Sequence, residues 1–151
     1  MAANEVNVYL YNRMPKSAFK KGFDFENDDI RLMLLSDDYT PDQENHVTLE
    51  DVEAYEISGD GYSSGGAELS NASIDYNEED DKVYFSADNV SWDSATFTFR
   101  WGVIYNNTED GNLNKNLIGF LDFQQEVGVI AGTVEINWHE DGIYRAKVVT
   151  E

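Results

Sequence analysis

Apolar and polar residues alternate in several short segments of this chain, beginning close to its N-terminus. Val6, Val8 and Leu10 are separated by single residues, a spacing that predicts either a strand or an extended arm. Pro15 stands at a suitable first position for a helix, and Gly22 stands at a suitable end. The N-terminal region is therefore predicted to hold one short strand or arm followed by one short helix.

The remainder of the chain has mostly the pattern of β-strands. Residues 30–35 are nearly all apolar and predict a buried strand, and one helical turn is expected to begin near Thr48. Phe97, Phe99 and Trp101 alternate with polar residues, which predicts another strand. Further strands are predicted in AELSNASIDY, KVYFSADNVSW, NLIGFLDF, GTVEINW and GIYRAKVV, separated by turns at NEEDD, TEDGNLNKN, QQEVGVIAG and HEDG.

Together these segments define the expected fold class. About seven to eight short strands separated by turns predict a mainly β protein, an antiparallel β-sandwich with one short N-terminal helix. A chain of 151 residues is long enough for one domain with a buried core. We expect residues 13–151 to form this sandwich domain, and residues 1–12 to be an N-terminal strand or a docking arm.

Glycine and serine dominate the stretch SGDGYSSGG at residues 58–66. A dinucleotide-binding loop needs the spacing G-x-G-x-x-G, whereas Gly59, Gly61 and Gly65 have one residue too many, and no lysine follows as in a phosphate loop. Glycines also permit backbone angles that other residues avoid. We therefore predict a structural turn formed by Gly59, Gly61, Gly65 and Gly66 and held in place by the ring of Tyr62.

The net charge of the chain excludes some classes of binding partner. Thirty acidic residues against ten basic ones give a formal net charge of −20, which repels nucleic-acid phosphates and anionic lipids. Four of the ten cations lie within nine residues, at Arg13, Lys16, Lys20 and Lys21. They form either a solvated helix face or a docking surface for an acidic partner, and both interpretations stay open.

Other features of the composition indicate the cellular compartment in which the protein folds. The absence of cysteine excludes disulfides and thiolate metal sites and suits a reducing cytoplasm. The N-terminus lacks the pattern of a signal peptide, and no stretch approaches the roughly 20 apolar residues of a membrane span. We expect a soluble protein that is made inside a cell.

Metal-binding patterns are incomplete in the acidic segments. A calcium loop that begins at Asp24 would have Asp29 in place of the required glycine and Leu35 in place of the final carboxylate. A loop that begins at Asn106 has Gly111 in the right position but Leu117 at its end. We predict no metal, with an irregular calcium site as the open alternative.

Catalytic patterns are equally weak. His46 and His139 are too isolated for a zinc motif, and no G-x-S-x-G segment supports a serine nucleophile. We predict no enzymatic activity and no cofactor. Exposed tryptophans could instead line a sugar-binding face, but Trp101 lies on the apolar side of its strand, and burial is also expected of Trp92 and Trp138.

From about Tyr9 to Tyr144, the chain resembles a known protein family in the order and spacing of many short sequence features. The segments are LYNRMPKSAFKKGFDFENDDIRLMLLSDDYTP, EISGDGYSSGGAELSNASI and KVYFSADNVSWDSATFTFRWGVIYNN, together with NLIGFLDF and INWHEDGIYR. They resemble a family of small bacteriophage virion structural proteins of the head-decoration or capsid-associated type. This chain departs from the pattern in the polar NTEDGNLNKN loop and the acidic YNEEDDK turn, which leaves its location on the particle open.

The resemblance implies a non-enzymatic virion protein without catalytic residues. We expect a capsid decoration or stabilising subunit on the outer surface of the head, synthesised in the cytoplasm of the host bacterium. Its expected partners are the major capsid protein or another virion subunit and further copies of itself, with no nucleic acid and no membrane. The alternatives are a tail- or neck-associated structural protein and a carbohydrate-binding host-adhesion module.

One hypothesis concerns how such a subunit attaches. Val6, Val8 and Leu10 would present an edge for strand addition, and the four cations that follow them would steer the contact. The competing interpretation is an ordinary first strand that is buried within its own domain.

Overall fold

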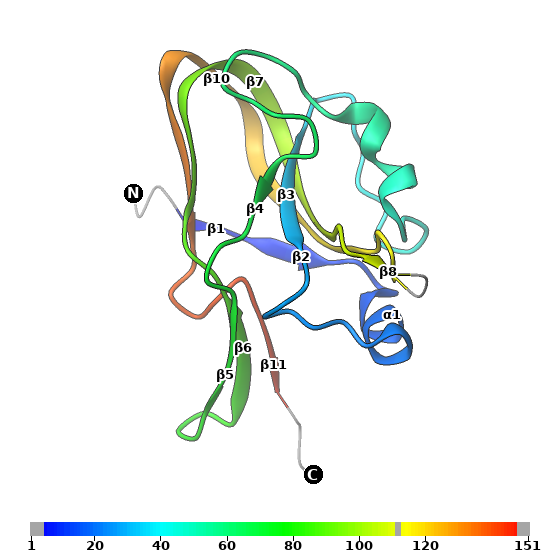
Figure 1. The fold of residues 1–151 in the computed structure, drawn as a ribbon. Coiled ribbons are helices and arrows are strands. Elements are labelled where there is room, and N and C mark those ends of the chain that lie inside the picture. The colour runs from blue at the N-terminus through cyan, green and yellow to red at the C-terminus, as the bar shows by residue number, and fades with distance from the viewer. Residues whose placement is uncertain (1–4, 111–112, 148–151) are drawn as a thin grey trace.

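Strands make up most of the computed structural model, which describes residues 5–110 and 113–147 (Figure 1). They form two largely antiparallel sheets, of six and three strands, together with a small two-stranded hairpin of β8 (Glu109–Asp110) and β9 (Leu113–Asn114). The described part of the chain holds one α-helix, close to its N-terminal end. The predicted mainly β sandwich with one short N-terminal helix is confirmed.

The larger sheet is built around a long hairpin. Its strand order is β1-β10-β7-β3-β4, and β2 also pairs with β10. All neighbours are antiparallel except β1, which runs parallel to β10. Its strands are β1 (Glu5–Val6), β2 (Val8–Leu10), β3 (Ile30–Leu35), β4 (Ala67–Glu68), β7 (Val90–Asn106) and β10 (Leu117–Trp138).

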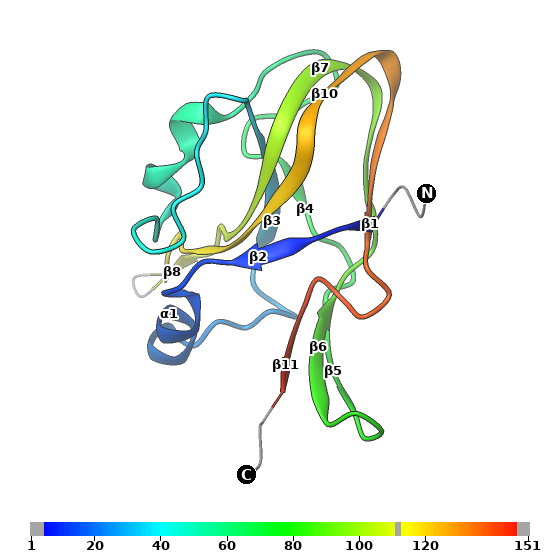
Figure 2. The ribbon, with the colours of Figure 1, turned by 180° about the vertical axis from the view of Figure 1, so that it is seen from behind.

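The hairpin of β7 and β10 rises and bends back like an arch (Figures 1 and 2). Register shifts interrupt the pairing between Asp122 and Val127 and between Val129 and Gly132, so one continuous strand can change direction. The predicted turn at QQEVGVIAG is therefore wrong, because residues 124–132 belong to β10. NLIGFLDF and GTVEINW are two parts of one strand.

The N-terminal strands connect the two ends of this arch. Leu10 pairs with Gly119 near the start of β10, whereas Val6 pairs with Trp138 at its end. Figure 2 shows β1 and β2 crossing between the two legs of the arch. The structure thus places residues 5–10 inside the sheet of the domain, as the interpretation of an ordinary first strand describes.

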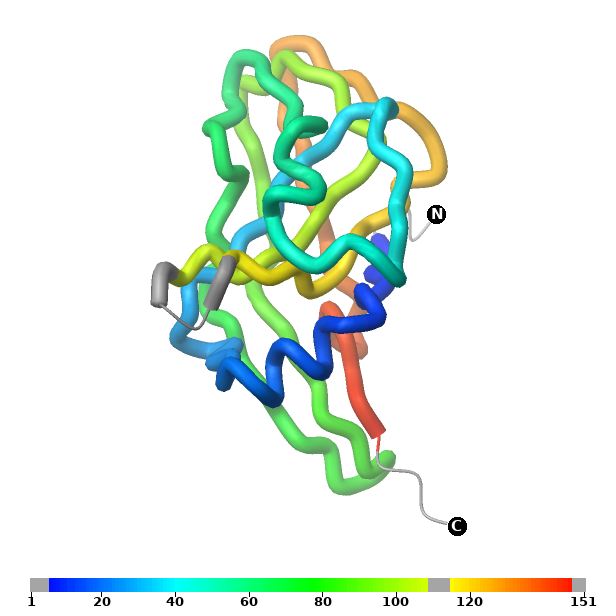
Figure 3. Tube along the Cα trace, turned by 90° about the vertical axis from the view of Figure 1, so that its right-hand side faces the viewer, coloured from blue at the N-terminus to red at the C-terminus, as the bar shows by residue number. Residues whose placement is uncertain are grey.

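The smaller sheet projects away from the arch (Figures 1 and 3). It consists of β5 (Ser73–Asn77), β6 (Lys82–Ser86) and β11 (Tyr144–Lys147) in the order β11-β6-β5. The predicted pairing across the acidic turn is confirmed by β5 and β6, but KVYFSADNVSW is divided between β6 and β7. Buried Phe85 lies between Ile74 and Tyr144 across the sheet, and the ring of Phe25 packs 5.2 Å from the ring of Phe85.

Short helices occupy two connections. The predicted helix is confirmed as α1 (Met14–Lys21), with Pro15 in its first turn and Gly22 in the left-handed conformation at its end. The predicted turn near Thr48 is confirmed as the first of two 3₁₀ turns, η1 (Leu49–Asp51) and η2 (Glu53–Tyr55). The carboxylate of Asp51 accepts a hydrogen bond of 3.0 Å from the N–H of Thr48 and so caps this turn.

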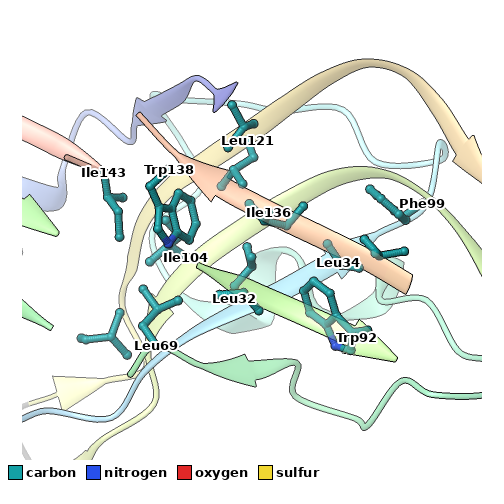
Figure 4. Close-up of a cluster of buried hydrophobic side chains, with 14 of the residues drawn as sticks. Leu32, Leu34, Leu69, Trp92, Phe99, Ile104, Leu121, Ile136, Trp138 and Ile143 are labelled. Atoms are coloured by element: carbon teal, nitrogen blue, oxygen red, sulfur yellow. The ribbon is translucent and has the colours of Figure 1, made fainter. Parts of the chain in front are cut away.

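Two clusters of buried side chains cover opposite faces of the larger sheet. Leu32 and Leu34 belong to the cluster inside the arch, which Figure 4 shows together with Phe99, Ile104 and Trp138. Met33 and Leu35 belong to the second cluster, on the outer face. Because β3 is buried on both faces, it needs apolar residues at successive positions, which is why its sequence shows no alternation.

Candidate interaction surface

The most exposed large apolar side chain in the described part of the chain lies on α1. Phe19 is 89 % exposed, and Arg13, Lys16 and Lys20 are exposed beside it. The spacing of these four residues places them on one side of the helix, which we call the basic helix face. Met14 and Ala18, on the other side, pack against the inner cluster. Figure 3 shows α1 on the outside of the molecule, toward the viewer.

The charges of the basic helix face are not neutralised within the described chain. Arg31 and Arg100 have carboxylate partners, Asp29 at 3.0 Å and Asp122 at 2.8 Å. Arg13, Lys16 and Lys20, and half-buried Lys21 nearby, form no ion pair with any residue that the structure describes. The helix C-terminus itself favours the lysines of the last turn. An acidic partner would supply the missing counter-charges.

The three apolar residues of the hypothetical docking edge have a structural role within the domain. Val6 is buried, and Val8 and Leu10 are half-buried and pack against the inner cluster. The chain approaches β10 so closely that a Cβ at Gly119 would lie 2.9 Å from Cγ1 of Val8. These side chains therefore stabilise the domain, whereas the cations that follow them lie at its surface.

The glycine-rich stretch lies against two strands of the larger sheet. Gly59, Gly61, Gly65 and Gly66 all have positive φ angles. A Cβ would lie 2.6 Å from the carbonyl oxygen of Thr96 if placed on Gly59, and 2.9 Å from that of Asp93 if placed on Gly61. The ring of Tyr62 packs 6.2 Å from the ring of Trp92. Close backbone contacts leave no room for a side chain at Gly59, Gly61 and Gly66, whereas the nearest atom to a Cβ on Gly65 would be 3.5 Å away.

Glu56 organises the same turn, although the sequence did not single it out. Its carboxylate accepts hydrogen bonds from the hydroxyl of Tyr62 at 2.8 Å and from the N–H of Gly65 at 2.7 Å. The hydroxyl of Tyr62 in turn accepts a bond of 3.1 Å from the N–H of Leu34 on β3. Burial raises the pKa of Tyr62, which keeps its hydroxyl protonated as the donor. The sequence signal that could have identified this role is the position of Glu56, an acidic residue that shortly precedes the glycine-rich stretch.

Candidate catalytic and metal-binding side chains are dispersed. The described residues contain no group of three or more His, Asp or Glu side chains placed to hold a metal ion. Gly111, which one calcium pattern requires, lies outside the described residues. His46 bonds through Nδ1 to the hydroxyl of Tyr39 at 3.0 Å, and Nδ1 of His139 accepts the N–H of Asp141 at 3.0 Å. Each histidine is thus engaged in a local contact.

The tryptophans do not form an exposed aromatic face. Trp92 and Trp138 are buried, as expected, and the indole N–H of Trp138 donates to the carbonyl oxygen of Asp88 at 3.0 Å. Trp101, expected in the core, is only half-buried at the margin of the outer cluster, with the guanidinium of Arg100 3.9 Å above its ring. Trp92 and Trp138 therefore cannot serve as stacking surfaces for a sugar in this conformation.

Buried tyrosines make the fold sensitive to alkali. The hydroxyls of Tyr11 and Tyr39 lie 2.7 Å apart, and burial raises the pKa of Tyr11 and brings the pKa of Tyr39 to about 12. Burial likewise raises the pKa of Tyr105 to about 12 and raises the pKa of Tyr144. In the unfolded chain all of them would ionise near pH 10.

The contribution of these tyrosines to the stability of the fold should therefore be constant up to about pH 10 and fall from there towards pH 12, because the folded state holds these protons more tightly than the unfolded state. We expect an absorbance titration at 295 nm to show a tyrosinate step that coincides with loss of the near-ultraviolet circular dichroism signal. Complete ionisation while that signal persists would contradict the burial of these hydroxyls.

Three comparisons with known proteins were negative. No family model, no curated protein sequence and no solved structure matches it. Among the described residues, no helix is both long enough and apolar enough to cross a membrane.

Proposed function

We propose that the protein is a non-enzymatic structural subunit of a bacteriophage virion, a decoration or stabilising protein on the outer surface of the head. The sequence resemblance supports a role in the virion, and the surface of the domain indicates how the protein would bind to the shell. A mainly β domain that exposes one basic and aromatic helix face is suited to protein contacts. The proposed partner is the major capsid protein or another subunit of the shell.

The observation that carries the proposal is the basic helix face. Phe19 is 89 % exposed, and the cations around it have no counter-charge within the described chain. An aromatic side chain surrounded by charges is the composition of an interface centre with a polar rim. On a protein with a net charge of −20, this face is where an acidic partner meets the least repulsion.

The net charge also favours the outer side of the shell. A subunit with charge −20 on the inner side would lie against densely packed DNA phosphates, which costs electrostatic energy. On the outer side, the same charge keeps neighbouring particles apart and leaves the basic helix face to orient each copy. Several weak contacts in a symmetric shell then add to a strong attachment.

Charge reversal on the basic helix face tests this proposal. In Lys16→Glu/Lys20→Glu, we expect binding to particles that lack the subunit to weaken about tenfold or more, because two attractive contacts become repulsive. Both side chains are exposed, so the thermal unfolding midpoint should stay close to that of the unmodified protein. Co-sedimentation with the particles measures the binding.

The matched control is Lys82→Glu/Lys147→Glu, which makes the same change of charge on the smaller sheet, where these two residues pair across β6 and β11. The control should still co-sediment. Equal loss in both variants would show a general charge effect, and unchanged binding of Lys16→Glu/Lys20→Glu would exclude the basic helix face as the attachment site.

A further inference from the structure

A pocket of about 290 Å³ opens between the N-terminal strands and β11. Polar atoms make up most of its lining, and the smaller apolar part comes from Val6, Val8 and Leu10 on one side and from Ile143 and Tyr144 on the other. Figure 2 shows β2 crossing above the start of β11, with the large arch on the far side of β2. The volume lies near the lower limit of about 300 Å³ for ligand pockets, which suits one or two side chains.

One edge of β2 borders this pocket without a neighbouring strand. Among the described strands, β2 pairs only with β10. The N–H of Tyr11 donates to the carbonyl oxygen of Ile118 at 3.2 Å, so the antiparallel register directs the main-chain groups of Val8 and Leu10 away from β10. The Leu10 carbonyl oxygen accepts the side-chain amide of Gln43 at 2.8 Å. Both groups of Val8 and the N–H of Leu10 are left on the outer edge.

The charge around the pocket is unusual for this protein. Among the residues that the structure describes, its lining includes Arg145 and His139 and no carboxylate. Arg145 is exposed and forms no ion pair with a described residue. Asp141 lies next to the lining, where its carboxylate is 3.7 Å from Nδ1 of His139. On a chain with thirty acidic residues, the exposed guanidinium of Arg145 at this pocket favours an acidic side chain on a partner.

We propose that the outer edge of β2 and the adjoining pocket bind an extended segment of a partner protein by strand addition. The segment pairs its main chain with Val8 and Leu10, inserts one apolar side chain between Val8 and Ile143, and places an Asp or Glu near Arg145. Main-chain pairing supplies affinity, and the pocket and the cation supply specificity. Only the identity of the partner as a shell protein rests on the proposed function.

A displayed library of random ten-residue peptides, selected on the immobilised full-length protein, tests the site without any phage particle. We expect enriched peptides to share alternating apolar residues and at least one Asp or Glu. A synthetic peptide of the most enriched sequence should shift the backbone amide resonances of Val8 and Leu10. Failure of this experiment leaves the basic helix face untouched, so the two proposals fail separately.

Matched changes on the protein and the peptide then identify the contacts. Arg145→Gln should weaken the peptide about tenfold, the expected loss for one charge-assisted hydrogen bond. Lys147→Gln removes a cation of the same strand outside the pocket lining and should leave affinity unchanged. Methylating the peptide nitrogen opposite Val8 should abolish binding, and this change cannot disturb the protein fold.

The outcomes that would overturn the proposal are equally definite. They are a selection that enriches no peptide, an enriched peptide whose resonance shifts lie elsewhere, and equal effects of Arg145→Gln and Lys147→Gln. Binding that survives methylation would show a pocket for side chains alone and would exclude strand addition.

Discussion

Removal of residues 1–12 is expected to abolish folding, not merely attachment. The segment contains buried Val6 and Tyr11, and it pairs with both ends of β10. A fully buried large apolar side chain contributes about 1.5–3 kcal/mol. Together with half-buried Val8 and Leu10, the loss is comparable with the total stability of a domain, about 5–15 kcal/mol. Without β1 and β2, the two ends of β10 would also lose the strands that pair with them.

Circular dichroism and size-exclusion chromatography measure this outcome directly. We expect the truncated chain to aggregate or to lack a cooperative unfolding transition. Asn7→Ser, which changes an exposed side chain in the same segment, should unfold at the same temperature as the unmodified protein. A folded, monomeric product without residues 1–12 would show that the segment is a dispensable arm and that its pairing with β10 adds little.

Gly66→Ala is expected to lower the free energy of unfolding by about 3–5 kcal/mol, although it adds only one methyl group. Gly66 has a φ angle of +84°, which strains any residue with a side chain. An added Cβ would also lie 2.0 Å from the carbonyl oxygen of Leu32 and 2.8 Å from Cα of Met33. Because these are backbone atoms of strand β3, which is buried on both faces, they cannot move without disturbing both hydrophobic clusters.

Gly22→Ala provides the matched control for this prediction. Gly22 has a similar φ angle of +68°, but no atom lies within 4 Å of the position that a Cβ would take. Its replacement should cost about 1 kcal/mol, the strain alone. Urea unfolding of the two variants separates strain from steric contact. Equal losses would contradict the close packing of the glycine turn against β3.

Local signals in the sequence were sufficient for the short elements. Pro15 and Gly22 delimit α1, and the turn after Thr48 begins where it was predicted. The apolar run of residues 30–35 indicated a buried strand, and β3 is indeed covered on both faces. These features depend on residues that are close to one another in the chain.

Features that depend on contacts between residues far apart in the chain could not be predicted from the sequence. The segment QQEVGVIAG has the composition of a turn, yet pairing with β7 keeps it in a strand, and the bulges at Gln124 and Ala131, both with positive φ, bend it. The exposure of Phe19 also depends on which side of α1 packs against the domain. Arg145 and Val8 line one pocket only because β11 returns to the N-terminal strands.

Cryo-electron microscopy of the parent particle tests the proposed function most directly. At a resolution that distinguishes strands, we expect the domain on the outer surface of the head, with α1 turned towards the shell and Phe19 in contact with it. Density for the domain on the tail, on the inner side of the shell or nowhere on the particle would contradict the account.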